Sequence, residues 1–152
     1  MTRTIIENFD QASFEDALWI WRRGVEGVVE VVDPDPSIEG LRHWVESEVL
    51  LAHRFRVATV SNEVVGVMAS NSESVCALYI RPDHQHKGIG SAMLELAKKD
   101  SAGSLWLFTF AKNLQARSFY AKHGFLEVAF GFESHFQLDD VKLSWSPATN
   151  AA

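Results

Sequence analysis

Two closely spaced glycines, Gly88 and Gly90, stand where a buried strand passes into an apolar-faced helix, in the segment 80–91 with the sequence IRPDHQHKGIGS. Glycines at such a turn let the backbone approach a ligand closely. The free amides at the start of the helix favour a phosphate group. Gln85 and Lys87 can add a hydrogen-bond donor and a positive charge. An ordinary tight turn has the same pattern, so the glycine pair alone leaves both interpretations open.

The spacing of these glycines excludes two other phosphate-binding motifs. No Gly-Lys-Ser/Thr follows a four-residue spacer, as a P-loop requires. Met93 stands in place of the third glycine of a dinucleotide-binding fingerprint, and no acidic residue closes a second strand about 20 residues later.

A second pair of side chains with possible chemistry is Asn113 and Tyr120. Seven residues make almost two helical turns, so both side chains lie on one face of a helix. An asparagine that caps the helix, with a tyrosine above it, can hold a polar ligand and offer a proton. The alternative is that Asn113 only caps the helix and that Tyr120 only packs its ring.

The elements that must position these residues follow from the hydrophobic periodicity. The first helix is predicted to begin at Ser13, where Asp16 completes a capping box, and Ser37 is the predicted cap of the second. The predicted strands are 54–60, 64–69, 75–80, 105–110, 126–132 and 141–145, and the later helices are 88–99 and 113–123. A right-handed crossover would make strands 75–80 and 105–110 parallel, within a mixed sheet. The predicted fold class is therefore α/β with a mixed sheet.

Length and composition indicate one globular domain, predicted to span residues 1–146 with a frayed tail at 147–152. The net charge of −6 disfavours nucleic-acid binding, and no stretch is apolar and long enough to span a membrane. We expect a cytoplasmic protein. The single cysteine, Cys76, excludes an internal disulfide and is expected to fill a buried strand without reacting. His84 and His86 have no third ligand in sight, so no metal site is predicted.

Together the two stretches resemble the GNAT superfamily of N-acetyltransferases. The family's acyl-CoA signature, Gln/Arg-x-x-Gly-x-Gly/Ala after a buried strand, is met by Gln85, Gly88 and Gly90. Its downstream pattern, an asparagine followed seven residues later by a tyrosine and then Gly-Phe, is met by Asn113, Tyr120, Gly124 and Phe125. The resemblance covers residues 54–133 and implies that strands 75–80 and 105–110 splay apart.

The resemblance also implies a role for individual residues in binding acetyl-CoA, the expected cosubstrate. Backbone groups at the end of the strand 75–80 would pair with the pantetheine arm, and helix-start amides would hold the pyrophosphate. The residues expected to bind the cosubstrate are Leu78, Tyr79, Ile80, Gln85, His86, Lys87, Gly88, Ile89, Gly90, Ser91, Asn113 and Tyr120. Tyr120 would stand near the thioester sulfur as the general acid.

The general base is less clearly marked. Protein N-terminal acetyltransferases of this superfamily often carry a glutamate five residues before the asparagine, where this chain has Phe108. Glu73 is the best remaining carboxylate, ahead of His135 and Asp33. Proton loss through a water chain would need no dedicated base.

The sequence therefore predicts an acetyl-CoA-dependent N-acetyltransferase that acts directly on the primary amine of a small molecule. Three alternatives stay open: a protein Nα- or lysine acetyltransferase, a catalytically silent CoA-binding module, and a plain nucleotide-binding α/β domain. The expected partners are acetyl-CoA and an amine acceptor, and the oligomeric state is left open, a homodimer included.

Overall fold

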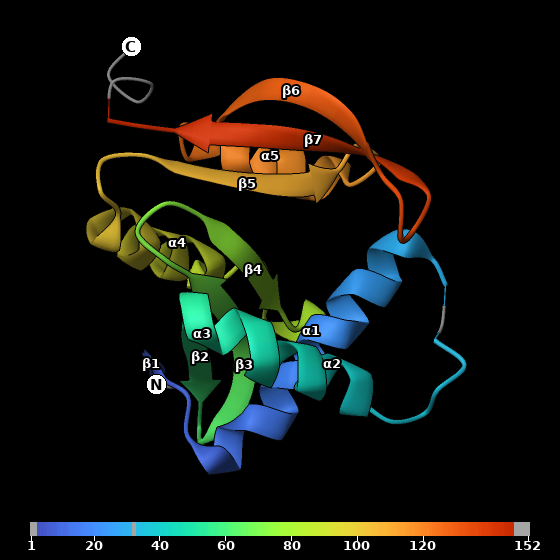
Figure 1. Ribbon diagram of the computed structural model, residues 1–152. Coiled ribbons are helices and arrows are strands. Elements are labelled where there is room, and N and C mark those ends of the chain that lie inside the picture. Colours follow the sequence, from blue (N-terminus) through green and yellow to red (C-terminus); the bar gives the residue numbers. More distant parts are fainter. Residues whose placement is uncertain (1–2, 32, 148–152) are drawn as a thin grey trace.

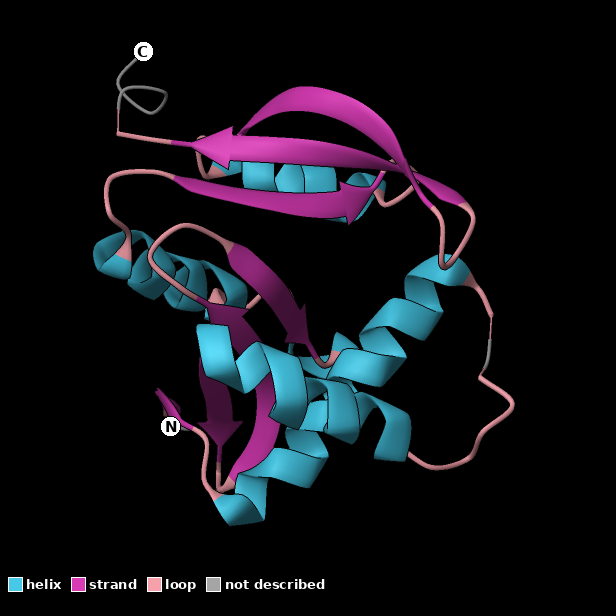
Figure 2. Ribbon diagram, in the orientation of Figure 1, coloured by secondary structure: helices cyan, strands magenta, loops and turns pink. Residues whose placement is uncertain are grey.

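The fold consists of two antiparallel sheets with helices packed around them (Figures 1 and 2). The computed structural model describes residues 3–31 and 33–147. The strands are β1 (Thr4–Asn8), β2 (Arg54–Val60), β3 (Glu63–Ser70), β4 (Val75–Ile80), β5 (Leu105–Phe110), β6 (Leu126–Glu133) and β7 (Leu138–Trp145). The helices are α1 (Gln11–Val29), α2 (Glu39–Trp44), α3 (Leu50–Ala52), α4 (Ile89–Asp100) and α5 (Leu114–Lys122), with a π-helical segment at Val45–Val49 and a 3-10 turn at Pro82–His84.

The sheets meet at the beginning of β4 and β5 and then separate. One has the order β1-β2-β3-β4 and the other the order β5-β7-β6. The backbone N–H of Trp106 donates to the carbonyl of Glu73 at 3.0 Å, beside an isolated parallel bridge between Ser74 and Trp106. Beyond this bridge no ladder joins β4 to β5 within the described residues. The predicted splay is confirmed, and the predicted parallel pairing is confined to this one point.

Two buried clusters hold the helices against the sheets. Leu18 and Trp21 of α1 pack on one face of the first sheet, against residues such as Val57 and Val67. Met93 and Leu94 of α4 belong to the other cluster, which also takes in side chains of both sheets and Tyr120. Burying these apolar faces fixes the sheets relative to each other. The first residues of α4 and the inner face of α5 are thereby placed next to the opening between β4 and β5.

The N-terminal region differs from the prediction. Strand β1 was not predicted, and the N-cap of α1 is Asp10 rather than Ser13. The N–H of Ser13 donates to Asp10 Oδ1 at 2.9 Å, and the N–H of Asp10 donates to Ser13 Oγ at 3.0 Å. Ser13 is therefore the reciprocal partner of this capping box. The predicted second helix is divided by its π-helical segment.

The C-terminal tail predicted at 147–152 lies outside the described residues from 148 onward. Among the described residues, no helix is both long and apolar enough to cross a membrane.

Candidate functional site

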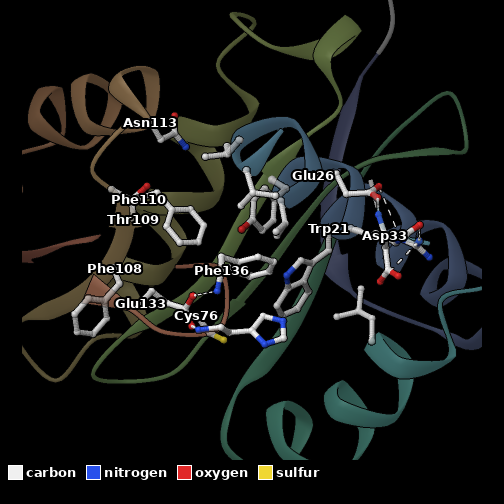
Figure 3. Close-up of a pocket in the computed structure, with 18 of the residues that line it drawn as sticks. Trp21, Glu26, Asp33, Cys76, Phe108, Thr109, Phe110, Asn113, Glu133 and Phe136 are labelled. Atoms are coloured by element: carbon white, nitrogen blue, oxygen red, sulfur yellow. Dashed lines mark hydrogen bonds and ion pairs between the residues drawn. The ribbon is translucent and has the colours of Figure 1, made fainter. Parts of the chain in front are cut away.

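A cleft of about 1120 Å³ occupies the opening between the two sheets. Its walls come from β4, β5, α1, α5, the loop and helix start at 33–41, and the β6–β7 hairpin. Figure 3 shows Asn113 and Phe110 on one side of this cleft, with Trp21 and Glu26 on the other. The end of α1 and the β5–α5 turn also meet through an ion pair, in which Lys112 Nζ lies 3.9 Å from Glu30 Oε2. The splayed strands therefore open into a space enclosed by segments that are far apart in the sequence.

Strand β4 supplies an unpaired backbone edge to the cleft. The N–H of Arg81 donates to the carbonyl of Val65 at 2.8 Å, which fixes the alternation of hydrogen bonds between β4 and β3. By this alternation Tyr79 pairs with β3, whereas the backbone groups of Leu78 and Ile80 point to the open edge. Gln85 Nε2 donates to the carbonyl of Ile80 at 3.0 Å. Both polar groups of Leu78 and the N–H of Ile80 remain for an extended ligand to pair with.

The start of α4 presents a group of unpaired amides beside that edge. None of the six amides from His86 to Ser91 donates a hydrogen bond within the described part of the chain. Gly88, the N-cap residue, has a φ of 83°, and His86 has a φ of 62°, so the backbone is left-handed at both positions. Such a run of outward amides forms a concave site for an anion. Residues 85–91 do not line the cleft itself, and they follow directly on the strand that does.

Gln85 has a positioning role in this loop. Its Nε2 donates to the Ile80 carbonyl at 3.0 Å, and its Oε1 accepts from Gln115 Nε2 at 3.2 Å. The side chain therefore ties the end of β4 to α5. The sequence had suggested that the Gln85 side chain donates a hydrogen bond to the ligand. In the structure its Nε2 donates to the backbone carbonyl of Ile80 instead.

Helix α5 brings Asn113 and Tyr120 to the cleft. Asn113 Oδ1 accepts from the N–H of Ala116 at 3.1 Å, so the side chain caps the helix and its amide nitrogen has no partner within the described residues. Tyr120 is buried, with its ring against Phe119 and Phe125. No described group hydrogen-bonds with its hydroxyl. Burial, followed by the nearby Tyr79, raises the pKa of Tyr120 above its usual value of 10, so the hydroxyl is a proton donor at neutral pH.

These features of β4, α4 and α5 agree with the comparison with known proteins. A family model for the GNAT acetyltransferase domain matches residues 51–127. The chain belongs to the GNAT acetyltransferase family. The peptidyl-lysine N-acetyltransferase YjaB of Salmonella typhimurium is 32% identical over 111 residues, which are 73% of this chain and 75% of the relative.

Two solved structures share the fold of this GNAT acetyltransferase. The yncA protein of Salmonella typhimurium, solved with its cofactor acetyl-CoA, superposes with a TM-score of 0.74 at 17% identity and covers 95% of this chain and 94% of its own. The apo form of YjaB from Escherichia coli gives a TM-score of 0.74 at 23% identity, over 94% of this chain and 97% of its own. These likenesses extend the fold assignment to nearly the whole acetyltransferase chain.

The carboxylates of this acetyltransferase are distributed differently from the sequence prediction. Glu73 is exposed in the turn before β4 and is not among the residues that line the cleft. The weaker candidates, Asp33 and His135, do line it. So does Glu133, which the sequence analysis missed and whose carboxylate accepts from the N–H groups of His135 at 3.0 Å and Phe136 at 2.6 Å. No local signal marked Glu133, because only the tertiary fold brings the β6–β7 hairpin to the cleft.

The loop after α1 closes the side of the cleft opposite α5. Arg22 donates hydrogen bonds to the carbonyls of Ser37 and Asp35, and it forms an ion pair with Glu26 at 3.8 Å. The N–H of Asp33 donates to Glu26 Oε2 at 2.8 Å. These contacts fix the loop on α1, so the wall that it forms has a defined shape.

Aromatic side chains line the same part of the cleft. Trp21 is buried and Trp44 half-exposed, and their rings contact at 5.7 Å in an edge-on arrangement. Phe136 approaches from the β6–β7 hairpin, and its ring lies 5.7 Å from that of Phe110. Trp19 packs against the buried cluster that contains Leu18 and Trp21, and it is not a lining residue.

The expectation that Cys76 fills a buried strand is wrong. Cys76 is an exposed free thiol on β4 and lines the cleft (Figure 3). The prediction failed because Cys76 is the extra residue of a β-bulge: Ala69 pairs with Ala77 and Ser70 with Val75, so Cys76 leaves the regular alternation of the strand. The surrounding walls raise the pKa of the thiol by desolvation, so it is protonated at neutral pH.

The histidines near the start of α4 are half-buried at His84 and exposed at His86. Among the described residues, no group of three or more His, Cys, Asp or Glu side chains could hold a metal ion.

Proposed function

We propose that this protein transfers the acetyl group of acetyl-CoA directly to the primary amine of a small molecule. The observation that carries the proposal is the meeting, in one cleft, of an unpaired β4 edge and the protonated, unpartnered hydroxyl of Tyr120. The first can hold an extended thioester arm and the second can protonate the sulfur that leaves.

The cosubstrate would lie along β4, the start of α4 and the start of α5, as the family resemblance implies. The pantetheine amides pair with the free backbone groups of Leu78 and Ile80, as an added strand would. The diphosphate accepts hydrogen bonds from the amides of residues 86–91. The free amide nitrogen of Asn113 donates to a carbonyl of the arm. This arrangement directs the thioester toward the wide part of the cleft, beside Tyr120.

The reaction then needs one addition and one elimination. The neutral amine attacks the thioester carbon, and negative charge builds on the carbonyl oxygen. A free N–H of the β4 edge, at Leu78 or Ile80, stabilises that charge. The C–S bond breaks as the Tyr120 hydroxyl donates its proton to the sulfur, which yields the amide and free CoA. The former amine nitrogen loses one proton to water, and Tyr120 regains a proton from water, so the enzyme returns to its starting state.

The proton on the incoming ammonium must leave before the attack, since an alkylamine has a pKa near 10.4. Water in the open cleft can carry it out without a dedicated base. Glu73 is exposed and lies outside the cleft, so it takes no part in this proton loss, and replacement of Glu73 by glutamine should leave the turnover unchanged. A loss of turnover in that variant would restore Glu73 as the base.

The walls of the cleft favour a small acceptor with an apolar body. Trp21, Trp44 and Phe136 offer aromatic surface. Arg22 pairs with both Glu26 and Asp33, and the carboxylates of Asp35, Glu133 and Asp140 keep the charge of the lining negative. Such walls suit a protonated amine before its deprotonation. The second candidate is a lysine side chain of a peptide, which the named activity of the 32% identical relative favours.

One assay separates these acceptors. Release of free CoA from acetyl-CoA is followed by a thiol reagent with small alkyl- and arylalkylamines, polyamines, aminoglycosides and lysine peptides, and the acetylated product is identified by mass spectrometry. We expect several small amines to stimulate release, and peptides to have little effect. Efficient acetylation of peptide lysines alone would replace the small-molecule proposal with the lysine candidate.

Cys76 offers an independent measure of cosubstrate binding. It is the single cysteine and lines the cleft, so acetyl-CoA should slow its alkylation by a maleimide, whereas ATP and NAD should not. Equal protection by ATP would favour a nucleotide-binding domain. Protection by acetyl-CoA without acetylation of any amine would identify a catalytically silent CoA-binding module.

A further inference from the structure

A serine and a histidine from two different helices meet at the phosphate end of the proposed site. Ser91 belongs to the first turn of α4, and His123 is the C-cap residue of α5. Ser91 Oγ and His123 Nε2 lie 3.0 Å apart, within hydrogen-bond distance. This contact links the amide-rich turn to the helix that carries Asn113 and Tyr120.

The His123 ring is held in place by more than this one hydrogen bond. Its ring centroid lies 4.7 Å from that of Phe119. Its carbonyl accepts from Lys98 Nζ at 2.7 Å, and the Lys98 side chain is only 8% exposed. The Phe119 contact holds the ring and the Lys98 hydrogen bond holds the backbone of His123, so that Nε2 lies at hydrogen-bond distance from Ser91.

We propose that His123 is a positioning residue for the diphosphate of acetyl-CoA, acting through the hydroxyl of Ser91. The inference rests on the proposed function, because it takes the turn at residues 86–91 as the diphosphate site. When Nε2–H donates to Ser91 Oγ, the serine must direct its own proton elsewhere. The unpaired amide of Ser91 lies in the same turn, so hydroxyl and amide together can donate to one phosphate group.

Burial and the charged groups around His123 favour a neutral ring in the free protein. Glu95 Oε1 lies 3.9 Å from Nδ1, on the exposed side of α4. Burial, and then the positive charge of Lys98, lower the pKa of His123, against a smaller opposite effect of Glu95; Lys122 on α5 acts in the same direction as Lys98. A bound diphosphate adds negative charge near the ring and must raise its pKa.

The test compares ligands with and without the diphosphate. The variants Ser91→Ala and His123→Leu are each measured by calorimetry with CoA, and by kinetics with acetyl-CoA and with acetyl-pantetheine, which lacks the diphosphate. We expect the affinity for CoA to fall about three- to tenfold in each variant, with little further loss in the double variant, because both remove the same hydrogen bond. We expect KM for acetyl-CoA to rise by a similar factor, and the loss in kcat/KM to be at least threefold smaller with acetyl-pantetheine than with acetyl-CoA.

Two control variants and one spectroscopic measurement complete the experiment. Ser118→Ala and His43→Leu replace exposed residues outside the site and should leave CoA affinity unchanged. In the wild-type protein, the imidazole pKa of His123, followed by NMR, should rise on adding CoA and stay constant on adding pantetheine. A purely structural histidine would not show this selective rise.

The proposal is overturned if both variants bind CoA as the wild type does, if the loss is equal with and without the diphosphate, or if CoA leaves the His123 pKa unchanged. The outcome is separate from that of the proposed function. A wild-type protein that binds CoA and acetylates no amine refutes the transferase proposal, while the calorimetric and NMR comparisons still decide the role of His123.

Discussion

The ring of Tyr79 lies directly against Gly24: a β-carbon at position 24 would be 2.3 Å from Cδ1 of Tyr79. Gly24 is in the middle of α1, and Tyr79 is on β4. This close approach lets the helix hold the tyrosine ring in the wall of the cleft. Burial and the nearby Cys76 raise the pKa of Tyr79 to about 12, so its hydroxyl is also uncharged at neutral pH.

The contact predicts that Gly24→Ala disturbs both stability and the site. The added methyl group must displace the Tyr79 ring, and overpacking of this kind costs about 1–3 kcal/mol. Alanine in a helix returns up to about 1 kcal/mol relative to glycine, so we expect a net loss of about 0–2 kcal/mol in the free energy of unfolding. Urea denaturation and kcat/KM for acetyl transfer measure the two effects.

Gly27→Ala is the matched control on the same helix. A β-carbon at position 27 meets nothing within 4 Å, so this change should stabilise the protein by about 0.5–1 kcal/mol and leave activity unchanged. Equal stabilisation by both alanines would show that the Tyr79 ring can move away without cost.

Asp100 at the end of α4 is expected to stabilise the first sheet through Arg56. The Arg56 side chain is 9% exposed, and its Nη2 donates to Asp100 Oδ2. The other terminal nitrogen, Nη1, is buried without a partner in the structure. Asp100→Asn removes the charge that compensates this guanidinium. Breaking a fully buried pair costs about 3–5 kcal/mol, and since Asp100 is 39% exposed we expect about half of that in thermal or urea unfolding.

Arg54 separates this effect from that of an ordinary surface ion pair. Arg54 Nη1 lies 3.1 Å from the same Asp100 oxygen, but its side chain is 55% exposed. Arg54→Gln should therefore change the free energy of unfolding by less than about 1 kcal/mol. Losses of the same size in Asp100→Asn and Arg54→Gln would argue against a special role of the buried arginine.

The sequence predicted best those parts of the fold that local periodicity and turn residues determine. Strands β4 and β5 have the predicted bounds, and Asn113 caps α5 as expected. Strand β1 was missed because it is short and mostly exposed, and among the strands it pairs with β2 alone. The cap of α1 was misplaced because a capping box is reciprocal: Ser13 takes part in it, but as the N3 residue of Asp10.

The site was predictable where its residues lie close to a motif, and not where they meet only in space. Asn113 and Tyr120 share a helix face, and the splay of β4 and β5 follows from the family resemblance. Glu73 was chosen for its proximity to β4 along the chain, but the turn carries it away from the cleft. Glu133 enters the cleft through the pairing of β6 with β7, which no short segment of sequence encodes.

The two roles of Asn113 can be separated by two substitutions. Asn113→Ala removes both the cap and the side-chain amide, and should lower the free energy of unfolding by about 0.5–2 kcal/mol. Asn113→Ser keeps a capping oxygen and should restore most of that stability. We expect KM for acetyl-CoA to rise severalfold in both variants, because serine does not replace the free amide nitrogen. If serine restores KM together with stability, Asn113 serves only as a cap.

Tyr120→Phe should lower kcat about tenfold to a hundredfold while leaving KM for acetyl-CoA nearly unchanged. The loss is limited because a thiolate, with a parent pKa near 8.5, is already a fair leaving group. Burial keeps the Tyr120 pKa above 10, so the folded protein retains this proton throughout the neutral and mildly alkaline range. The wild-type kcat should therefore show no decrease that originates from Tyr120 up to about pH 10.

Tyr79→Phe is the matched control, since these two residues are the only tyrosines of the chain and both line the cleft. The ring of residue 79 stays in place against Gly24, so kcat should remain within about twofold of the wild-type value. Steady-state rates of CoA release for the two variants, measured at several pH values, decide between the tyrosines. A loss confined to Tyr79→Phe would transfer the role of general acid to Tyr79, and unchanged turnover in both variants would remove a tyrosine acid from the mechanism.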